Sequence, residues 1–177
     1  PWQRCQQMSE QTIDSQTVAA TRSPWPVFAV CATGFFIIMF DLAVVNVAFP
    51  DILSDFGVSR ADGSWIVTLY NILFGSLLVV AGKTADSVGR RRIFQIGVAT
   101  FGLGAALAAF APTLAVLLAG RAVQGVGAAF MSPAALGLLV AAFPLKRRTQ
   151  TMSLWGAVGA LGVSSGPSIG AAITWLP

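Results

Sequence analysis

An arginine in the middle of a long apolar run is the feature that most constrains this chain. Arg121 lies inside an apolar stretch from Pro112 to Phe143, and Asp41 lies inside another from Pro26 to Phe49. Each stretch is long enough to cross a bilayer, which takes about 20 helical residues. A charge at the centre of a spanning helix costs about 2.5–3.5 kcal/mol on insertion scales, so such charges usually face a bundle interior or a water-filled path. We therefore expect a membrane protein with an ionisable interior.

The composition supports this expectation and excludes other classes. Of the 177 residues, 55% are hydrophobic and 10% are charged, whereas soluble domains average about 25% charged residues. The chain has no histidine, and Cys5 and Cys31 lack the spacing of a zinc or redox site. No nucleophile–base pair or cluster of metal ligands is apparent, so we expect no enzyme activity, no metal and no cofactor. The basic residues gather in short connections between apolar runs, which argues against nucleic-acid binding.

Five apolar segments are predicted to be transmembrane helices, because the backbone has no water to bond to in lipid. They cover about residues 26–49, 64–82, 93–111, 113–143 and 151–176. The expected fold class is thus an all-α transmembrane helix bundle over residues 25–177, after a polar tail at 1–24. Pro50 is expected to end the first helix, and Pro133 is the expected place for a bend in the fourth.

The connections between these segments predict the orientation. Lysines and arginines stay on the cytoplasmic side of a membrane. The two basic connections fall on one side of the predicted bundle: Lys83, Arg90, Arg91 and Arg92 in one, Lys146, Arg147 and Arg148 in the other. The connection between the first two helices holds Arg60 against three aspartates: Asp51, Asp55 and Asp62. We expect a multi-pass protein of the cytoplasmic membrane with its N-terminus in the cytoplasm.

The stretch from Gly82 to Arg92 is a candidate gating loop. Gly82 and Gly89 permit a tight turn between two helices. Asp86 is expected just before the third helix, where a carboxylate favours the positive helix end. Arg90 and its neighbours can hold carboxylates or lipid phosphates. The plainer alternative is an ordinary basic loop.

Two polar residues share one face of the fourth helix. Arg121 and Gln124 are three residues apart, and the small residues up to Ala129 allow another helix to approach closely. The alternative is a structural hydrogen-bond cluster between helices.

Asp41 and Arg121 are expected at similar depth in the membrane. Asp41 lies about nine residues from the outer end at Pro50, and Arg121 about nine residues from the outer turn at Pro112. If their helices are neighbours, the two charges can pair or share a water-filled cavity. Asn46 adds an uncharged polar group to the first helix. The alternative for Asp41 is a fixed partner of Arg121 with no role in proton traffic.

A glycine stripe marks the fifth helix. Gly162, Gly166 and Gly170 recur every fourth residue, which allows close helix contact. Pro167 removes a backbone donor and is expected to kink this helix. The alternative role is helix packing alone.

Together these motifs resemble the major facilitator superfamily. Gly82–Arg92 is similar to its loop signature between helices 2 and 3, and Arg121–Ala129 to its RxxQGxxxA signature on helix 4. Gly162–Ala171 resembles the GxxxGPxxGG signature of antiporters. Asp41–Pro50 resembles the LDxTVVNVALP signature of the fourteen-helix drug:proton antiporter branch, and Trp65–Tyr70 its WxxTxY start of helix 2.

The chain also departs from the family pattern. Thr84 stands where Leu is usual, Ser87 where Arg is usual, Ala171 where Gly is usual and Ala43 where Thr is common. The fourth helix has no acid, so a salt bridge from the loop to that helix has no partner there. These departures weaken the expectation of loop-based gating.

The resemblance implies the first five helices of a proton-coupled efflux transporter of amphipathic drugs or antibiotics, as an N-terminal fragment without its C-terminal half. The implied partners are the lipid bilayer, an amphipathic small molecule, protons and that second half. The implied roles are proton coupling for Asp41 and Arg121, a substrate path for Asn46 and Gln124, gating for Gly82, Asp86, Gly89 and Arg90, and helix sealing for Gly162, Gly166, Pro167 and Gly170. Two alternatives are an uptake carrier for a small nutrient and a non-transporting truncated membrane polypeptide.

Overall fold

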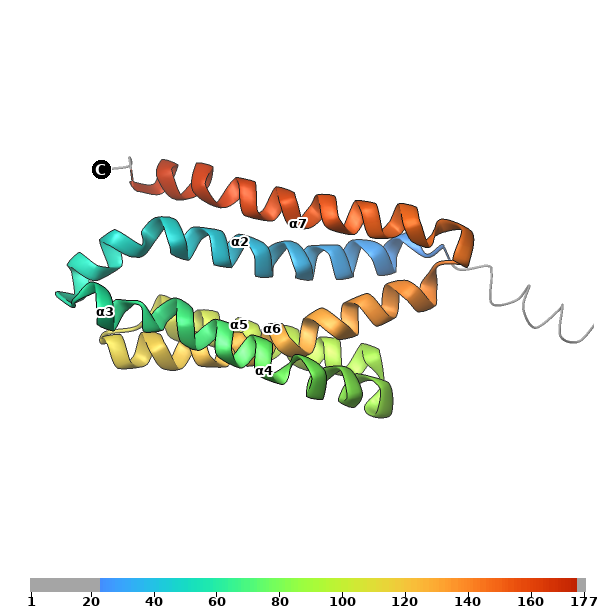
Figure 1. The fold of residues 1–177 in the computed structure, drawn as a ribbon, viewed down its shortest axis with the longest axis horizontal. Helices are drawn as coiled ribbons and strands as arrows, with labels where there is room; N and C mark the ends of the chain where they lie inside the picture. The colour runs from blue at the N-terminus through green and yellow to red at the C-terminus, as the bar shows by residue number, and fades with distance from the viewer. Residues whose placement is uncertain (1–22, 175–177) are drawn as a thin grey trace, which may run out of the picture.

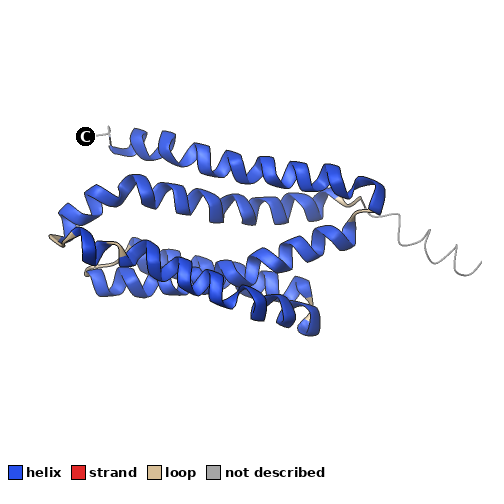
Figure 2. Cartoon of the chain, viewed as in Figure 1, coloured by secondary structure: helices blue, strands red, loops and turns tan. Residues whose placement is uncertain are grey.

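Long helices make up the part of the chain that the structure describes. The computed structural model describes residues 23–174, and no strand occurs in that range (Figures 1 and 2). The helices are α2 (Trp25–Phe56), α3 (Arg60–Gly63), α4 (Trp65–Val88), α5 (Arg90–Ala109), α6 (Leu114–Ala142) and α7 (Leu145–Thr174). The five long helices correspond to the five predicted segments, and the short α3 was not predicted. The polar tail at 1–24 lies almost wholly outside the described residues.

Four stretches of the described chain are long and apolar enough to cross a membrane. They are Trp25–Phe56, Arg60–Val88, Arg90–Ala109 and Leu114–Ala142. Helix α7 has 30 residues but is not among them. The prediction of a fifth span therefore stays a prediction.

The end of α2 differs from the expectation. The helix continues through Pro50 to Phe56, so the prediction that Pro50 ends it is wrong. Proline removes one backbone hydrogen bond, and a long apolar helix tolerates this loss where the freed carbonyl finds another partner. The helix ends instead at Gly57, whose φ of 60° is a left-handed conformation that glycine adopts without strain.

The turn between α4 and α5 is also tighter than predicted. Helix α4 runs to Val88, so Gly82 is helical and does not form the turn. Asp86 accordingly lies in the last turn of α4 instead of preceding the next helix on its own. Gly89 alone separates the two helices, with a φ of 113° that favours glycine.

Helix α6 is the centre of the bundle. It packs against α4, α5 and α2, while α7 packs along α2 (Figure 1). Glycines bring the backbones of α5 and α6 together: a Cβ atom on Gly104 would lie 2.6 Å from the backbone nitrogen of Gln124, and one on Gly120 would lie 2.8 Å from that of Ala108. The close approach predicted from the small residues of this helix is confirmed.

The direction of α6 changes along its length. Its later part (orange in Figure 1) leaves the line of its first part and rises toward α7. Pro133 lies inside this helix, where a missing backbone donor permits a bend.

Candidate functional site

A buried ion pair joins the two helices that carry charges in their apolar runs. Nη1 of Arg121 on α6 donates to Oδ2 of Asp41 on α2 at 2.6 Å. The side chain of Arg121 is 2% exposed and that of Asp41 is 19% exposed. The two charges therefore lie at the same depth and in contact, as their positions in the sequence suggest.

Gln124 closes this pair into a network of three side chains. Its Oε1 accepts a hydrogen bond from Arg121 Nη1 at 2.9 Å, and its Nε2 donates to Asp41 Oδ1 at 3.0 Å. Both carboxylate oxygens of Asp41 thus accept a hydrogen bond. An ionised carboxylate only accepts, so this arrangement fits an ionised Asp41. Gln124 belongs to the charged network and is 2% exposed.

Helix α4 supplies further contacts to the guanidinium. Nε of Arg121 donates to the backbone oxygen of Ile66 at 3.3 Å. Its Cζ lies 4.4 Å from the centre of the Tyr70 ring, a distance at which cation–π attraction is effective. The Tyr70 hydroxyl and Arg121 Nη2 are buried and make no hydrogen bond in the described part of the chain.

Tyr70 is the site residue that the sequence did not assign. It is fully buried and lies under the charge of Arg121. A signal was present, because Tyr70 is the single tyrosine of the chain and closes the Trp65–Tyr70 stretch. The contact itself depends on α4 and α6 being neighbours, which the sequence did not show.

Asn46 lies apart from this network. Its Nδ2 donates to the backbone oxygen of Leu42 in the same helix at 2.7 Å, and its side chain is exposed. The structure therefore does not bring Asn46 to Gln124, and its assignment to a substrate path stays a prediction.

A second Asp–Arg pair lies at the junction of α4 and α5. Nε and Nη2 of Arg90 donate to Asp86 Oδ1 at 3.0 and 2.9 Å. Nη1 of Arg90 also donates to the backbone oxygen of Gly137 on α6 at 2.7 Å. Although α6 has no acid, the loop arginine contacts it through a main-chain carbonyl.

Gly137 makes room for this contact and was not predicted. A Cβ atom there would lie 2.7 Å from both Cδ and Nε of Arg90. Together with Gly82, Asp86 and Arg90, it lines a pocket of about 300 Å³ between α4 and α6. Of the four predicted gating residues, Gly89 alone is outside this pocket, in the turn.

The glycine stripe of α7 faces α2. A Cβ atom on Gly162 would lie 2.9 Å from Cβ of Met39, and one on Gly166 would overlap Ala43. Gly159 extends this face, where a Cβ atom would lie 2.6 Å from Phe35. The surroundings of Gly170 lie outside the described residues. Helix α7 continues through Pro167 to Thr174.

Known proteins share this pattern over most of the chain. Residues 31–176 match the Major Facilitator Superfamily. The multidrug resistance protein Stp of Mycobacterium tuberculosis is 39% identical over 138 residues, which are 77% of this chain and 26% of that protein. The methylenomycin A resistance protein of Streptomyces coelicolor is 41% identical over 140 residues, 78% of this chain and 30% of that protein.

A third relative carries a different kind of name. The riboflavin transporter RibZ of Clostridioides difficile is 31% identical over 152 residues, 86% of this chain and 33% of that protein. The chain thus spans about a quarter to a third of the length of these relatives. The match to the family covers four of the five long helices and nearly all of α2, so the chain is a multi-pass membrane protein that belongs to the Major Facilitator Superfamily.

Proposed function

We propose that this chain is the N-terminal part of a proton-coupled efflux transporter of amphipathic drugs or antibiotics in the cytoplasmic membrane. The observation that carries the proposal is the buried network of Asp41, Arg121 and Gln124. The names of two relatives, one a multidrug resistance protein and one a methylenomycin A resistance protein, support export of such compounds. In this proposal the chain makes and breaks no covalent bond of its substrate.

Protonation of Asp41 would change the network in a defined way. The ionised carboxylate accepts one hydrogen bond on each oxygen, from Arg121 and from Gln124. A protonated carboxyl carries an O–H that donates, so one of these two hydrogen bonds must weaken or break. The neutral carboxyl also no longer compensates the charge of Arg121, which is then free to move or to bind another partner.

Coupling follows if the two facing states of the transporter bind the proton and the drug with different affinities. A ligand shifts a conformational equilibrium only by its differential affinity for the two states. If the state that binds the proton well binds the drug poorly, entry of a proton expels the drug. Arg121 is suited to transmit this change, because it contacts α2 through Asp41 and α4 through Ile66 and Tyr70.

Transport in everted membrane vesicles tests the proposal. The longer protein that contains this chain should accumulate a cationic dye only when a proton gradient is imposed. Asp41→Asn should abolish this accumulation, while Asp41→Glu, which keeps a titratable group, should retain part of it. Full, gradient-dependent accumulation by the Asp41→Asn protein would remove Asp41 from proton coupling.

The proposed orientation places the N-terminus and both basic connections in the cytoplasm. Ser59 and Ser87 are exposed and lie at opposite ends of the α3–α4 unit. In a cysteine-free background, a membrane-impermeant reagent added to intact cells should label Ser59→Cys and spare Ser87→Cys. The opposite labelling would reverse the orientation and with it the proposed direction of transport.

An uptake carrier for a small nutrient is the second candidate. The name of the riboflavin transporter relative favours it. The direction of gradient-driven flux separates the two: an exporter fills everted vesicles, whereas an importer fills right-side-out vesicles.

A further inference from the structure

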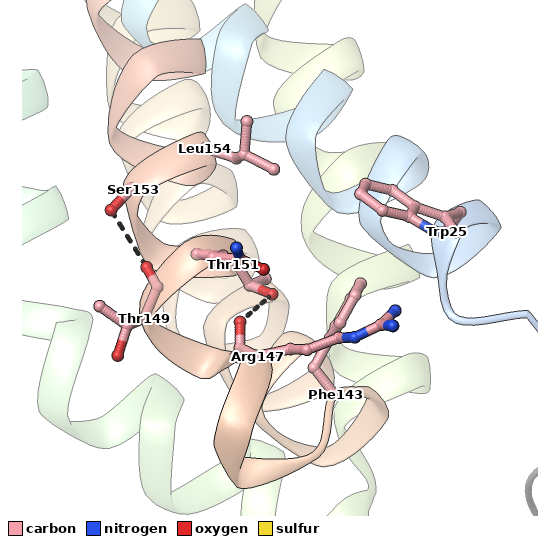
Figure 3. Close-up of a pocket in the computed structure, with 8 residues that line it drawn as sticks. Trp25, Phe143, Arg147, Thr149, Thr151, Ser153 and Leu154 are labelled. Atoms are coloured by element: carbon pink, nitrogen blue, oxygen red, sulfur yellow. Dashed lines mark hydrogen bonds between the residues drawn. The ribbon is translucent and has the colours of Figure 1, made fainter.

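A pocket of about 490 Å³ lies at the opposite end of α2 from Gly57. It is formed by Trp25 at the start of α2, by Phe143 at the end of α6 and by the first turns of α7 (Figure 3). The pocket is separate from the Asp41–Arg121 network, and nothing in the proposed transport mechanism uses it.

One wall of this pocket is cationic. Arg147 lines it, and Figure 3 shows the guanidinium extending past Phe143 on the side of Trp25. Among residues 23–168, Arg147 has no ion pair and its side chain makes no hydrogen bond. The adjacent Arg148 differs, because its Nη2 donates to the backbone oxygen of Val140 on α6 at 3.0 Å. Arg148 is therefore part of the α6–α7 junction, whereas the charge of Arg147 remains available to a ligand.

The local electrostatics favour an anion. Three basic residues, Lys146, Arg147 and Arg148, begin α7, and its first turn contains no acid. Positive side chains at the positive end of a helix repel its dipole. A negative group bound beside Arg147 would offset this repulsion and form charge-assisted hydrogen bonds.

The other walls of the pocket are apolar. Trp25 is 52% exposed, and its ring packs edge-on against Phe143 with centroids 5.9 Å apart. Leu154, which is 43% exposed, lies on α7 across the pocket (Figure 3). Apolar walls beside an unpaired cation suit a ligand that has an anionic head and a hydrocarbon body.

The position along α2 places this pocket at the membrane surface. Trp25 precedes Asp41 by more than four helical turns, or about 24 Å along the axis. Asp41 lies well inside the apolar run, so Trp25 falls in the headgroup region, where exposed tryptophans are enriched. Phospholipids are the amphipathic anions present at that depth.

We propose that this pocket binds the headgroup phosphate of an anionic phospholipid. Arg147 binds the phosphate, and Trp25 and Leu154 contact the glycerol backbone and the first carbons of the acyl chains. The bound lipid would fasten the start of α2 to the start of α7 at this surface.

Native mass spectrometry of the full chain in detergent micelles tests the proposal. Titration with phosphatidylglycerol should give a bound lipid that phosphatidylcholine does not displace at equal concentration. Arg147→Gln should weaken this binding about tenfold, the loss expected for a charge-assisted hydrogen bond. Lys146→Gln removes the same charge one residue away but outside the lining of the pocket, so it should leave binding unchanged. Equal weakening in both variants, or no weakening in either, would overturn the proposal.

Two further measurements guard against trivial outcomes. Arg147→Lys should keep most of the binding, and circular dichroism should show equal helix content in all variants, which separates loss of the site from loss of the fold. Soluble glycerol phosphate and inorganic phosphate should not displace the lipid at millimolar concentration, because they lack the hydrocarbon body. Displacement by either would show that a free anion, not a lipid, is the occupant. A result against transport in the vesicle assay would leave this binding result unaffected.

Discussion

The chain contains two aspartate–arginine pairs whose chemistry is the same and whose surroundings differ. Asp41 and Arg121 come from different helices and meet at 2.6 Å with side chains 19% and 2% exposed. Asp86 and Arg90 are four residues apart around one turn and meet at 2.9 Å with side chains 67% and 38% exposed. The first pair connects α2 to α6 inside the bundle, whereas the second lies at its surface.

The difference shows which charges carry energetic weight. An exposed pair at this spacing contributes about 0.3–0.5 kcal/mol, because water solvates both charges when the pair is broken. In a buried pair, removal of one partner leaves an uncompensated charge and destabilises a protein by about 3–5 kcal/mol. A proton that arrives at Asp41 therefore acts on a large energy, and a proton that arrives at Asp86 does not.

The largest expected effect is that of neutralising one member of the buried pair. Arg121→Ala leaves Asp41 without its cation, and we expect an unfolding free energy about 3–5 kcal/mol lower in mixed detergent–SDS micelles. Asp41→Asn should be nearly as damaging, because Arg121 then lacks a counter-ion. Both variants should also abolish gradient-driven transport by the longer protein.

The double variant sharpens this prediction. Asp41→Asn combined with Arg121→Gln removes both charges, so it should fold better than either single variant and still fail to couple transport to protons. Strict additivity of the two losses would show that the charges do not interact energetically.

The contact of Tyr70 with Arg121 gives the next largest effect. Tyr70→Leu removes the aromatic face and leaves a smaller side chain in a fully buried position, so we expect a loss of about 2–3 kcal/mol. Tyr70→Phe keeps the ring and removes only a hydroxyl that has no hydrogen-bond partner in the described chain, so it should be close to neutral. Equal losses in the two variants, measured in the same micelles, would contradict a cation–π role.

The sequence predicted the buried pair because its signal is local. Two charges inside apolar runs, at similar distances from the outer turns, placed Asp41 and Arg121 at one depth before any helix packing was known. The helices themselves were predictable for the same reason, because apolar runs of this length must form helices in lipid. Gln124 could be assigned to the face of Arg121 by its spacing alone.

The features that the sequence missed depend on packing between helices or on how helices end. Tyr70 and Gly137 acquire their roles only because α4 and α5 lie against α6. The helix ends were wrong at Pro50 and Gly82 because proline and glycine are weaker breakers inside long apolar helices than in soluble ones. What ends these helices is a glycine with positive φ, at Gly57 and Gly89, and a sequence does not show which glycine adopts it.

A smaller effect is expected where the surface pair reaches α6. Gly137→Ala places a methyl group against the side chain of Arg90 and should displace its hydrogen bond to the Gly137 carbonyl. We expect a loss of about 1–2 kcal/mol. Gly75→Ala, at a helical glycine with open space around its Cβ position, is the matched control and should be neutral or slightly stabilising. A loss of equal size in the control would mean that substitution of any helix glycine disturbs this bundle.

The smallest expected effect separates the two pairs most directly. Asp86→Asn keeps the size and one acceptor oxygen of the side chain and removes its charge, while Arg90 retains its hydrogen bond to Gly137. We expect the unfolding free energy to fall by only about 0.3–0.5 kcal/mol, and this loss should shrink further in high salt because exposed charges are screened. The buried variant Asp41→Asn should show no such dependence on salt. If Asp86→Asn nevertheless stopped transport at unchanged stability, the surface pair would act on the equilibrium between facing states and not on the fold, because its contribution to folding is too small to account for the loss.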